Sequence, residues 1–141
     1  MKVKESIEEE EQEIKVGKEH SELAIKFLRE GEELLGREDA IQASEKLYKA
    51  AEEAVKSLAE VYASDIYKEA KSKGRWTVRL LEKAIDTLAG ELGEEIERYW
   101  EAAWFLHVEG FHETRLDISS VKRRLKYVKK LVELEQRRNA K

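Results

Sequence analysis

The stretch of sequence that decides the fold is residues 40–62, AIQASEKLYKAAEEAVKSLAEVY. Wound as an α-helix at about 100° per residue, it gathers its alanines with Leu47, Tyr48 and Leu58 on one half of the cylinder. The other half carries the charged and amide side chains, which are Gln42, Glu45, Lys46, Lys49, Glu52, Glu53, Lys56 and Glu60. An apolar half-cylinder is wider than one neighbouring helix covers. We therefore expect this helix to be the centre of a bundle, packed against at least two other elements.

Helical periodicity continues on both sides of this stretch, and no segment alternates with the two-residue period of a strand. Gly36 is expected to close the first helix in a left-handed conformation, with Asp39 or Glu38 at the start of the next. Thr77 is the expected cap of a third helix, and Gly110 is expected to end a fourth, Trp-rich one. We predict an all-α fold, an antiparallel up-and-down bundle of about five helices.

Length and composition predict one domain. The chain of 141 residues is long enough for a single core and too short for two ordinary domains. Residues 1–17 hold few apolar side chains and are expected to form an acidic N-terminal arm or a helical extension, so the bundle domain covers residues 18–138. The central helix is expected to continue past Tyr62 until a break at Gly74.

The composition narrows the class of protein further. There are no cysteines, which excludes disulfides and thiolate metal sites, and no apolar run is long enough for a membrane span or a signal peptide. We therefore expect a cytoplasmic protein with no membrane partner and no cofactor. Charged residues make up 41% of the chain and proline is absent, a mixture that favours helix and resembles hyperthermophile usage. A thermophilic source is thus a hypothesis.

The charge is unevenly distributed. The net charge is −4, yet residues 122–141 hold nine Lys or Arg against two Glu, and residues 1–13 hold six Glu against two Lys. A cationic helix can follow a phosphate backbone, and the candidate nucleic-acid-binding residues are Lys122, Arg123, Lys126, Lys129 and Lys130. The favoured interpretation is a solvated helix face, because the whole chain is acidic. This run could also pair with the acidic segment Glu8–Glu13.

His107 and His112 are the first candidate pair for a metal site. Five residues apart, they point about 140° away from each other around an α-helix, so they cannot both bind one ion from a continuous helix. A turn at Gly110 could bring them together with Glu109 or Glu113. A packed histidine and an exposed one are the favoured interpretation, so we predict no metal site.

The helix of residues 94–108 is apolar almost all round. Such a helix is either surrounded by its own bundle or presents a face to a second chain. Trp100, Trp104 and Phe105 are the candidate self-association residues, although aromatic residues at helical spacing also fit a core. His20 is interpreted as a core or interface histidine.

The signatures of common enzyme classes are missing. The sequence contains no phosphate-binding GxxxxGK[ST] loop, no GxGxxG, no GxSxG and no HExxH, and it lacks the two paired Glu-x-x-His motifs that a di-iron bundle needs. The sequence therefore does not favour an enzyme.

Two longer pieces carry a resemblance to known families. The piece GEELLGREDAIQASEKLYKAAEEAVKSLAEVY and the later WFLHVEGFHE resemble the archaeal PaREP1 proteins. The chain also looks like the wider HEPN superfamily, whose second helix has a comparable pattern at Ala40, Ala43, Glu45, Lys46, Lys49 and Ala50. The resemblance covers about residues 18–135, and it implies a helical bundle that is commonly a dimer.

Active HEPN members cleave RNA with an arginine followed four to six residues later by a histidine, and this chain departs from that motif. Arg98 precedes His107 by nine residues, and Arg115 follows His112. We therefore expect a non-catalytic, HEPN-like interaction module that forms a homodimer. The alternative is an RNA-directed protein, either a ribonuclease or toxin-like member using these four residues, or a nucleotide- or RNA-binding partner of a nucleotidyltransferase.

Overall fold

A computed structural model describes the backbone of residues 2–139 and the side chains of residues 18–139. It contains six α-helices and one π-helical segment, η1. In chain order these are α1 (Lys2–Gly36), α2 (Ala40–Tyr62), α3 (Ser64–Lys73), α4 (Val78–Leu92), α5 (Glu95–Phe105), η1 (Leu106–His112) and α6 (Ile118–Asn139). None of the described helices has both the length and the apolar character needed to cross a membrane. No strand occurs within residues 2–139, which confirms the predicted all-α class.

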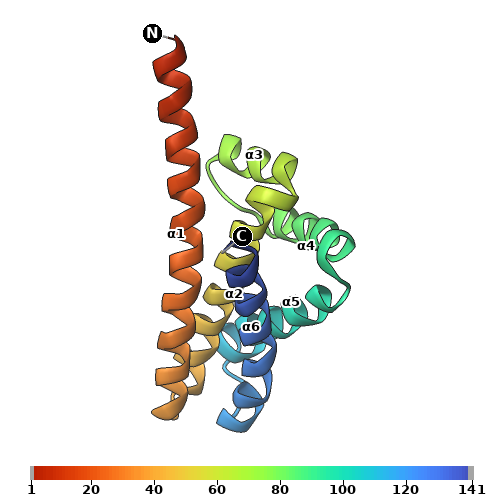
Figure 1. Ribbon diagram of the computed structural model, residues 1–141. Helices are drawn as coiled ribbons and strands as arrows, with labels where there is room; N and C mark the ends of the chain where they lie inside the picture. Colours follow the sequence, from red (N-terminus) through yellow and green to blue (C-terminus); the bar gives the residue numbers. More distant parts are fainter. Residues whose placement is uncertain (1, 140–141) are drawn as a thin grey trace.

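Helix α2 is the central element, as its sequence predicts. It contacts every other helix and η1, and Figure 1 shows α1 on one side of it and the α4–α5 pair on the other. Leu47 and Val55 are completely buried, and Leu58 is only 2% exposed. The packed half of this helix therefore combines alanines with large apolar side chains, as expected.

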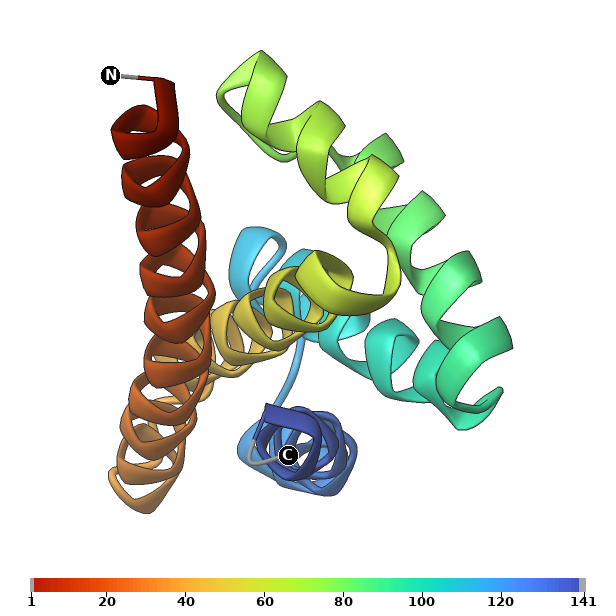
Figure 2. The same cartoon turned by 45° about the horizontal axis from the view of Figure 1, so that its top comes forward.

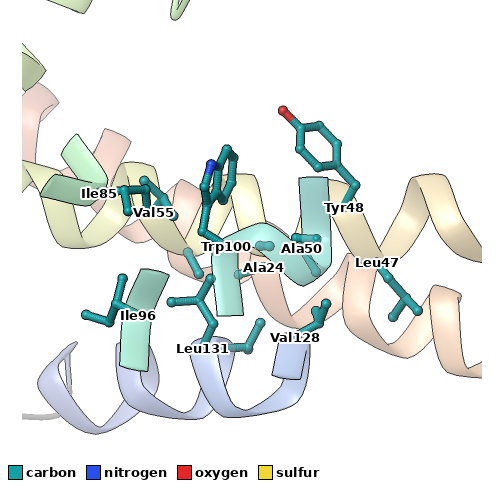
Figure 3. Close-up of a cluster of buried hydrophobic side chains, with 14 of the residues drawn as sticks. Ala24, Leu47, Tyr48, Ala50, Val55, Ile85, Ile96, Trp100, Val128 and Leu131 are labelled. Carbon is teal, nitrogen blue, oxygen red and sulfur yellow. The ribbon is translucent and has the colours of Figure 1, made fainter. Parts of the chain in front are cut away.

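Small and large residues combine where the neighbouring helices pack on α2. A Cβ atom on Gly31 of α1 would lie 2.6 Å from Leu47 Cδ2, so only glycine allows the close crossing of α1 and α2. Figure 3 shows Val55 of α2 near Trp100 of α5, with Leu131 of α6 in the same buried cluster. The core thus surrounds α2, with α1 on one side and α4, α5 and α6 on the other.

Helix α1 begins at Lys2 and not near residue 18. It runs without a break to Gly36, so the backbone of residues 2–17 forms a helical extension, one of the two predicted forms of the arm. Asn139 Nδ2 at the end of α6 donates to Ser21 Oγ at 3.1 Å, and the part of α1 before this contact extends past the packed helices (Figures 1 and 2). The expected pairing of Glu8–Glu13 with the basic run falls outside the described side chains.

The predicted central helix is divided in two. Helix α2 ends at Tyr62, and Ala63 leaves the helical region with φ −139° and ψ 52° before α3 starts. An unbroken helix would place Tyr67 on the polar half. The bend instead brings the ring centroids of Tyr67 and Trp76 to 6.3 Å from each other. Tyr67 is therefore buried in α3, which is a separate helix.

The up-and-down order of about five helices is not confirmed. The division at Ala63 adds a helix. Helices α4 and α5 cross α2 obliquely in both views (Figures 1 and 2). Residue spacing identifies helices, but it does not fix the angle at which they cross.

Two of the predicted caps are present, and one predicted turn residue is different. Asp39 and Thr77 each accept a backbone N–H from the first turn of α2 and α4, at 3.0 and 3.2 Å. The left-handed residue after α1 is Glu38, with φ 60°, and not Gly36. The reason is that the N–H of Asp39 bonds the carbonyl of Leu34 at 2.9 Å, and this bond closes a Schellman turn around residue 38.

Candidate functional site

The Trp-rich helix does not end at Gly110, because it continues from Leu106 to His112 as the π-helical segment η1. The N–H of Glu113 bonds the carbonyl of Val108 at 2.9 Å, the five-residue closure of a π-helix. Gly110 is buried, and a Cβ atom on it would lie 2.6 Å from Ser44 Cβ on α2. The prediction of a helix end at Gly110 is therefore wrong, since this glycine allows η1 to pack closely on α2.

The π-helical winding brings His107 and His112 to the same side. Hydrogen bonds in a π-helix join residues five apart, so side chains at i and i+5 come close together, which they do not in an α-helix. The two Nε2 atoms lie 3.2 Å apart. The prediction that a continuous helix keeps these rings apart is thus wrong, because it assumed α-helical winding.

A buried carboxylate extends this pair into the core. Glu45 of α2 is 9% exposed, and its Oε1 lies 3.2 Å from Nδ1 of His107. A carboxylate accepts hydrogen bonds, so Nδ1 of His107 carries the proton and its Nε2 faces His112. We call Glu45, His107 and His112 the histidine row; it runs from the core to the exposed His112.

Tyr48 forms one wall of the histidine row. Its ring stacks on that of His107 with the centroids 4.0 Å apart. Burial raises the pKa of Tyr48 above its ordinary value of 10, and the negative charges of Glu52 and Glu45 add to this effect. The phenol therefore stays protonated at neutral pH and serves as a packing surface for the imidazole.

A second feature is a groove between α5 and α6, which we call the cationic groove. It has a volume of about 420 Å³ and is lined by Arg98, Glu101, Ala102, Phe105, Arg123, Arg124, Lys126 and Tyr127. The guanidinium carbon of Arg124 lies 4.0 Å from the ring centroid of Phe105, a cation–π contact. Burial, together with neighbouring Arg123, lowers the pKa of Arg124, but a guanidinium remains charged in proteins. Four cations against one carboxylate make the groove attractive to anions.

A third feature, the apolar groove, adjoins the cationic groove on the α5–η1 surface. It is lined by Glu101, Trp104, Phe105, Val108 and Glu109. The two grooves share Glu101 and Phe105. One continuous surface therefore has Phe105 and Glu101 at its centre, with four cations on one side and Glu109 on the other.

Residues 19–132 match the Archaeal PaREP1/PaREP8 family. The chain belongs to this family. A crystal structure of a Sulfolobus solfataricus protein is 43% identical to this PaREP1 chain with a TM-score of 0.76, covering 81% of this chain and 93% of that one. A solution structure of the Orf c02003 protein is 44% identical with a TM-score of 0.70, covering 80% and 88%. No curated protein matches.

The PaREP1 structure brings together only part of the predicted RNA-directed site. His107 and His112 are neighbours, but Arg98 lines the cationic groove. Arg115 donates to Glu113 Oε2 at 3.0 Å, and this hydrogen bond holds the pKa of Arg115 above its ordinary value. The four residues therefore do not form one cluster.

The predicted nucleic-acid-binding residues are also divided. Arg123 and Lys126 line the cationic groove. Lys130 lines a separate hollow that includes two glutamates. Lys122 is exposed and Lys129 is half-buried, and both lie outside the cationic groove. The structure instead adds one cation that lies outside the basic run, Arg98 of α5.

The predicted self-association residues differ in exposure. Trp100 is 3% exposed, and its indole N–H donates to Glu82 Oε2 at 2.8 Å. It therefore belongs to the core of its own chain. Trp104 is half-buried and Phe105 is 37% exposed, so these two reach the surface of this PaREP1 protein.

Sequence reasoning missed two buried carboxylates. Glu45 lies on the predicted polar half of α2, and the one sequence feature that marks it is its place in the HEPN-like pattern of that helix. Glu135 of α6 is 1% exposed and was not considered. Its signal is spacing, because it follows Val128 by seven residues and therefore lies on the buried face of α6.

Proposed function

We propose that this PaREP1 protein is a non-catalytic, HEPN-like helical interaction module that forms a homodimer through the outer surface of α5, η1 and α6. The observation that carries the proposal is the shared surface of the two grooves. Phe105 is 37% exposed at the point where they meet. An exposed aromatic ring between oppositely charged regions is a common feature of protein interfaces.

The distribution of charges on this surface is compatible with a dimer that has two-fold symmetry. In a two-fold dimer the same patch meets itself after a rotation of half a turn. The cationic side, with Arg98 and Arg123, would then face Glu109 of the other copy, with Glu101 nearer the axis. A dimer placed in this way brings opposite charges together around the Phe105 rings.

The HEPN-like part of the proposal rests on the central helix. The residues that resemble the superfamily pattern lie in α2, which contacts every other element. The non-catalytic part rests on spacing and position, because Arg98 and His107 lack the motif spacing and line different features.

Light scattering of the full chain at micromolar concentration tests self-association. We expect a dimer for the wild type and a monomer for Phe105→Asp, because an interface would have to bury the new charge. Val78→Asp is the matched control, since Val78 is an apolar residue of α4 that is 52% exposed away from both grooves. A monomeric wild type, or equal dissociation of both variants, contradicts the proposal.

The cationic groove supports one alternative function, an RNA-directed role. Fluorescence anisotropy with a short single-stranded RNA at low and high salt tests it. The double variant Arg98→Glu/Arg123→Glu should lose binding, and the control Arg37→Glu, an exposed cation paired with Glu33, should keep it. Absence of binding at low salt excludes this role, including that of an RNA-binding partner of a nucleotidyltransferase.

An RNA degradation assay separates binding from cleavage. The non-catalytic proposal expects no degradation by the wild type. Degradation that is lost in both His107→Ala and His112→Ala would instead assign a ribonuclease or toxin-like activity to the histidine row.

A further inference from the structure

We propose that His107 and His112 bind a divalent transition-metal ion of the Zn²⁺, Ni²⁺ or Cu²⁺ kind through their Nε2 atoms. These atoms lie 3.2 Å apart. Two nitrogens bound to one tetrahedral ion at about 2.0–2.1 Å are themselves separated by roughly 3.3 Å. The rings are therefore already at the spacing of a metal chelate.

Glu45 gives a second, independent argument. Histidines that bind metals usually donate their other ring N–H to a carboxylate or carbonyl, which fixes the tautomer and the ring orientation. Glu45 Oε1 lies 3.2 Å from Nδ1 of His107. This contact directs the Nε2 lone pair of His107 toward His112.

The surrounding side chains hold one ligand and leave the other accessible. His107 is stacked on Tyr48 at 4.0 Å and lies 5.3 Å from the Trp104 ring. His112 is exposed, so an ion can reach the pair from solvent. A rigid first ligand reduces the entropy that is lost on binding.

The number and kind of ligands define the class of ion. Among residues 18–139, no group of three or more His, Asp, Glu or Cys residues is arranged around one point, so water would complete the coordination. Imidazole ligands suit zinc, nickel and copper, whereas magnesium and calcium prefer oxygen ligands.

Local charge also favours a cation. Glu109 and Glu113, on and beside η1, both pair with Arg115. With Glu45 at the inner end of the histidine row, this region holds more carboxylates than cations. A hydrogen bond between the two imidazoles would produce the same 3.2 Å spacing, so metal titration must decide between the two.

Calorimetric titration of the full chain, purified without a histidine tag, with Zn²⁺ near pH 7.5 provides the test. We expect one ion per wild-type chain, no response to Mg²⁺, and loss of Zn²⁺ binding in His112→Ala. His20→Ala is the matched control, because His20 of α1 pairs with Glu53 of α2 and not with the histidine row. Its removal should leave the Zn²⁺ affinity unchanged. Circular dichroism would show that each variant remains helical.

Glu45→Gln tests the orienting role separately. It should keep the stoichiometry and weaken binding by about tenfold or more. Unchanged affinity would overturn this role of Glu45. Absence of Zn²⁺ binding by the wild type, binding that persists in His112→Ala, or loss in His20→Ala would overturn the metal site itself.

Discussion

Glu135 is the residue on which the contact between three helices depends. Its carboxylate accepts from Ser57 Oγ of α2 at 2.7 Å and from Ser21 Oγ of α1 at 3.2 Å, and Gln136 Nε2 also donates to it. Neutral donors on both neighbours thus hold a carboxylate that is almost completely buried. A buried polar group is stabilising only while its partners are present.

Removal of this carboxylate should therefore be costly. We expect Glu135→Ala to reduce the free energy of unfolding by about 2–4 kcal/mol, because it leaves two hydroxyls without their acceptor and opens a cavity. Urea unfolding measures this change. Glu133→Ala, an exposed position on the same helix, should stay within about 0.5 kcal/mol of the wild type. Equal effects of the two substitutions would contradict the role given to Glu135.

Glu53 predicts a dependence of stability on pH. Burial raises the pKa of Glu53, but the hydrogen bond from His20 and the charge of Lys56 outweigh it, so the pKa lies below the ordinary value of 4.5. A carboxyl whose pKa is lower in the folded protein than in the unfolded chain stabilises the fold at pH values above its unfolded-state pKa. This stabilisation is lost as the pH falls through the folded-state pKa.

The wild type should therefore lose stability relative to Glu53→Gln between about pH 5 and pH 3. Urea unfolding at several pH values across this range measures the difference. A constant difference between the two proteins would show that Glu53 has no such effect.

For single residues, the sequence predicts interactions between chain neighbours better than interactions between distant parts of the chain. The caps Asp39 and Thr77 could be predicted because each bonds a backbone N–H three residues along the chain. Glu45 could not, since its partner His107 is 62 residues away. The site residues that were missed are those whose role depends on another element.

Among the elements, η1 departs most from expectation. Helical periodicity could predict the other helices because all follow the α-helical repeat, but it did not predict the division of α2 from α3 at Ala63. A π-helical turn holds more residues than an α-helical one, so spacing rules for α-helices misplace every side chain that follows. The separation of His107 and His112 in the α-helical prediction, and their contact in the structure, come from this difference.

Gly110→Ala tests the close packing of η1 on α2. Its Cβ would meet Ser44, so we expect a loss of about 1–3 kcal/mol in the free energy of unfolding. Gly90→Ala in α4 is the control, because the added Cβ atom would have no packing neighbour within 4 Å. It should stabilise the protein by about 0.5–1 kcal/mol through its better helix propensity. Similar stabilisation by both substitutions would show that η1 can move away from α2.

For the whole molecule, the all-α class and the central place of α2 could be predicted, whereas the crossing of α4 and α5 could not. Charged residues make up 41% of the chain. Several form ion pairs, such as Lys46–Glu30 at 2.9 Å and Lys73–Glu69 at 3.0 Å. Such pairs contribute more at high temperature, because the cost of removing charges from water falls.

We therefore expect a thermal midpoint above about 65 °C, the upper end of the mesophilic range. Scanning calorimetry measures it. A midpoint of a mesophilic kind would remove the thermophile hypothesis.

The place of α6 in the chain affects how the molecule is made in the cell. This 22-residue helix contacts α1, α2, α5 and η1, yet the ribosome produces it after all of them. Until it emerges, the earlier helices have no cover for the surfaces that Val121, Val128 and Leu131 later fill. The nascent chain thus exposes apolar surface until α6 has left the ribosome, and during that interval it is most prone to aggregate or to need a chaperone.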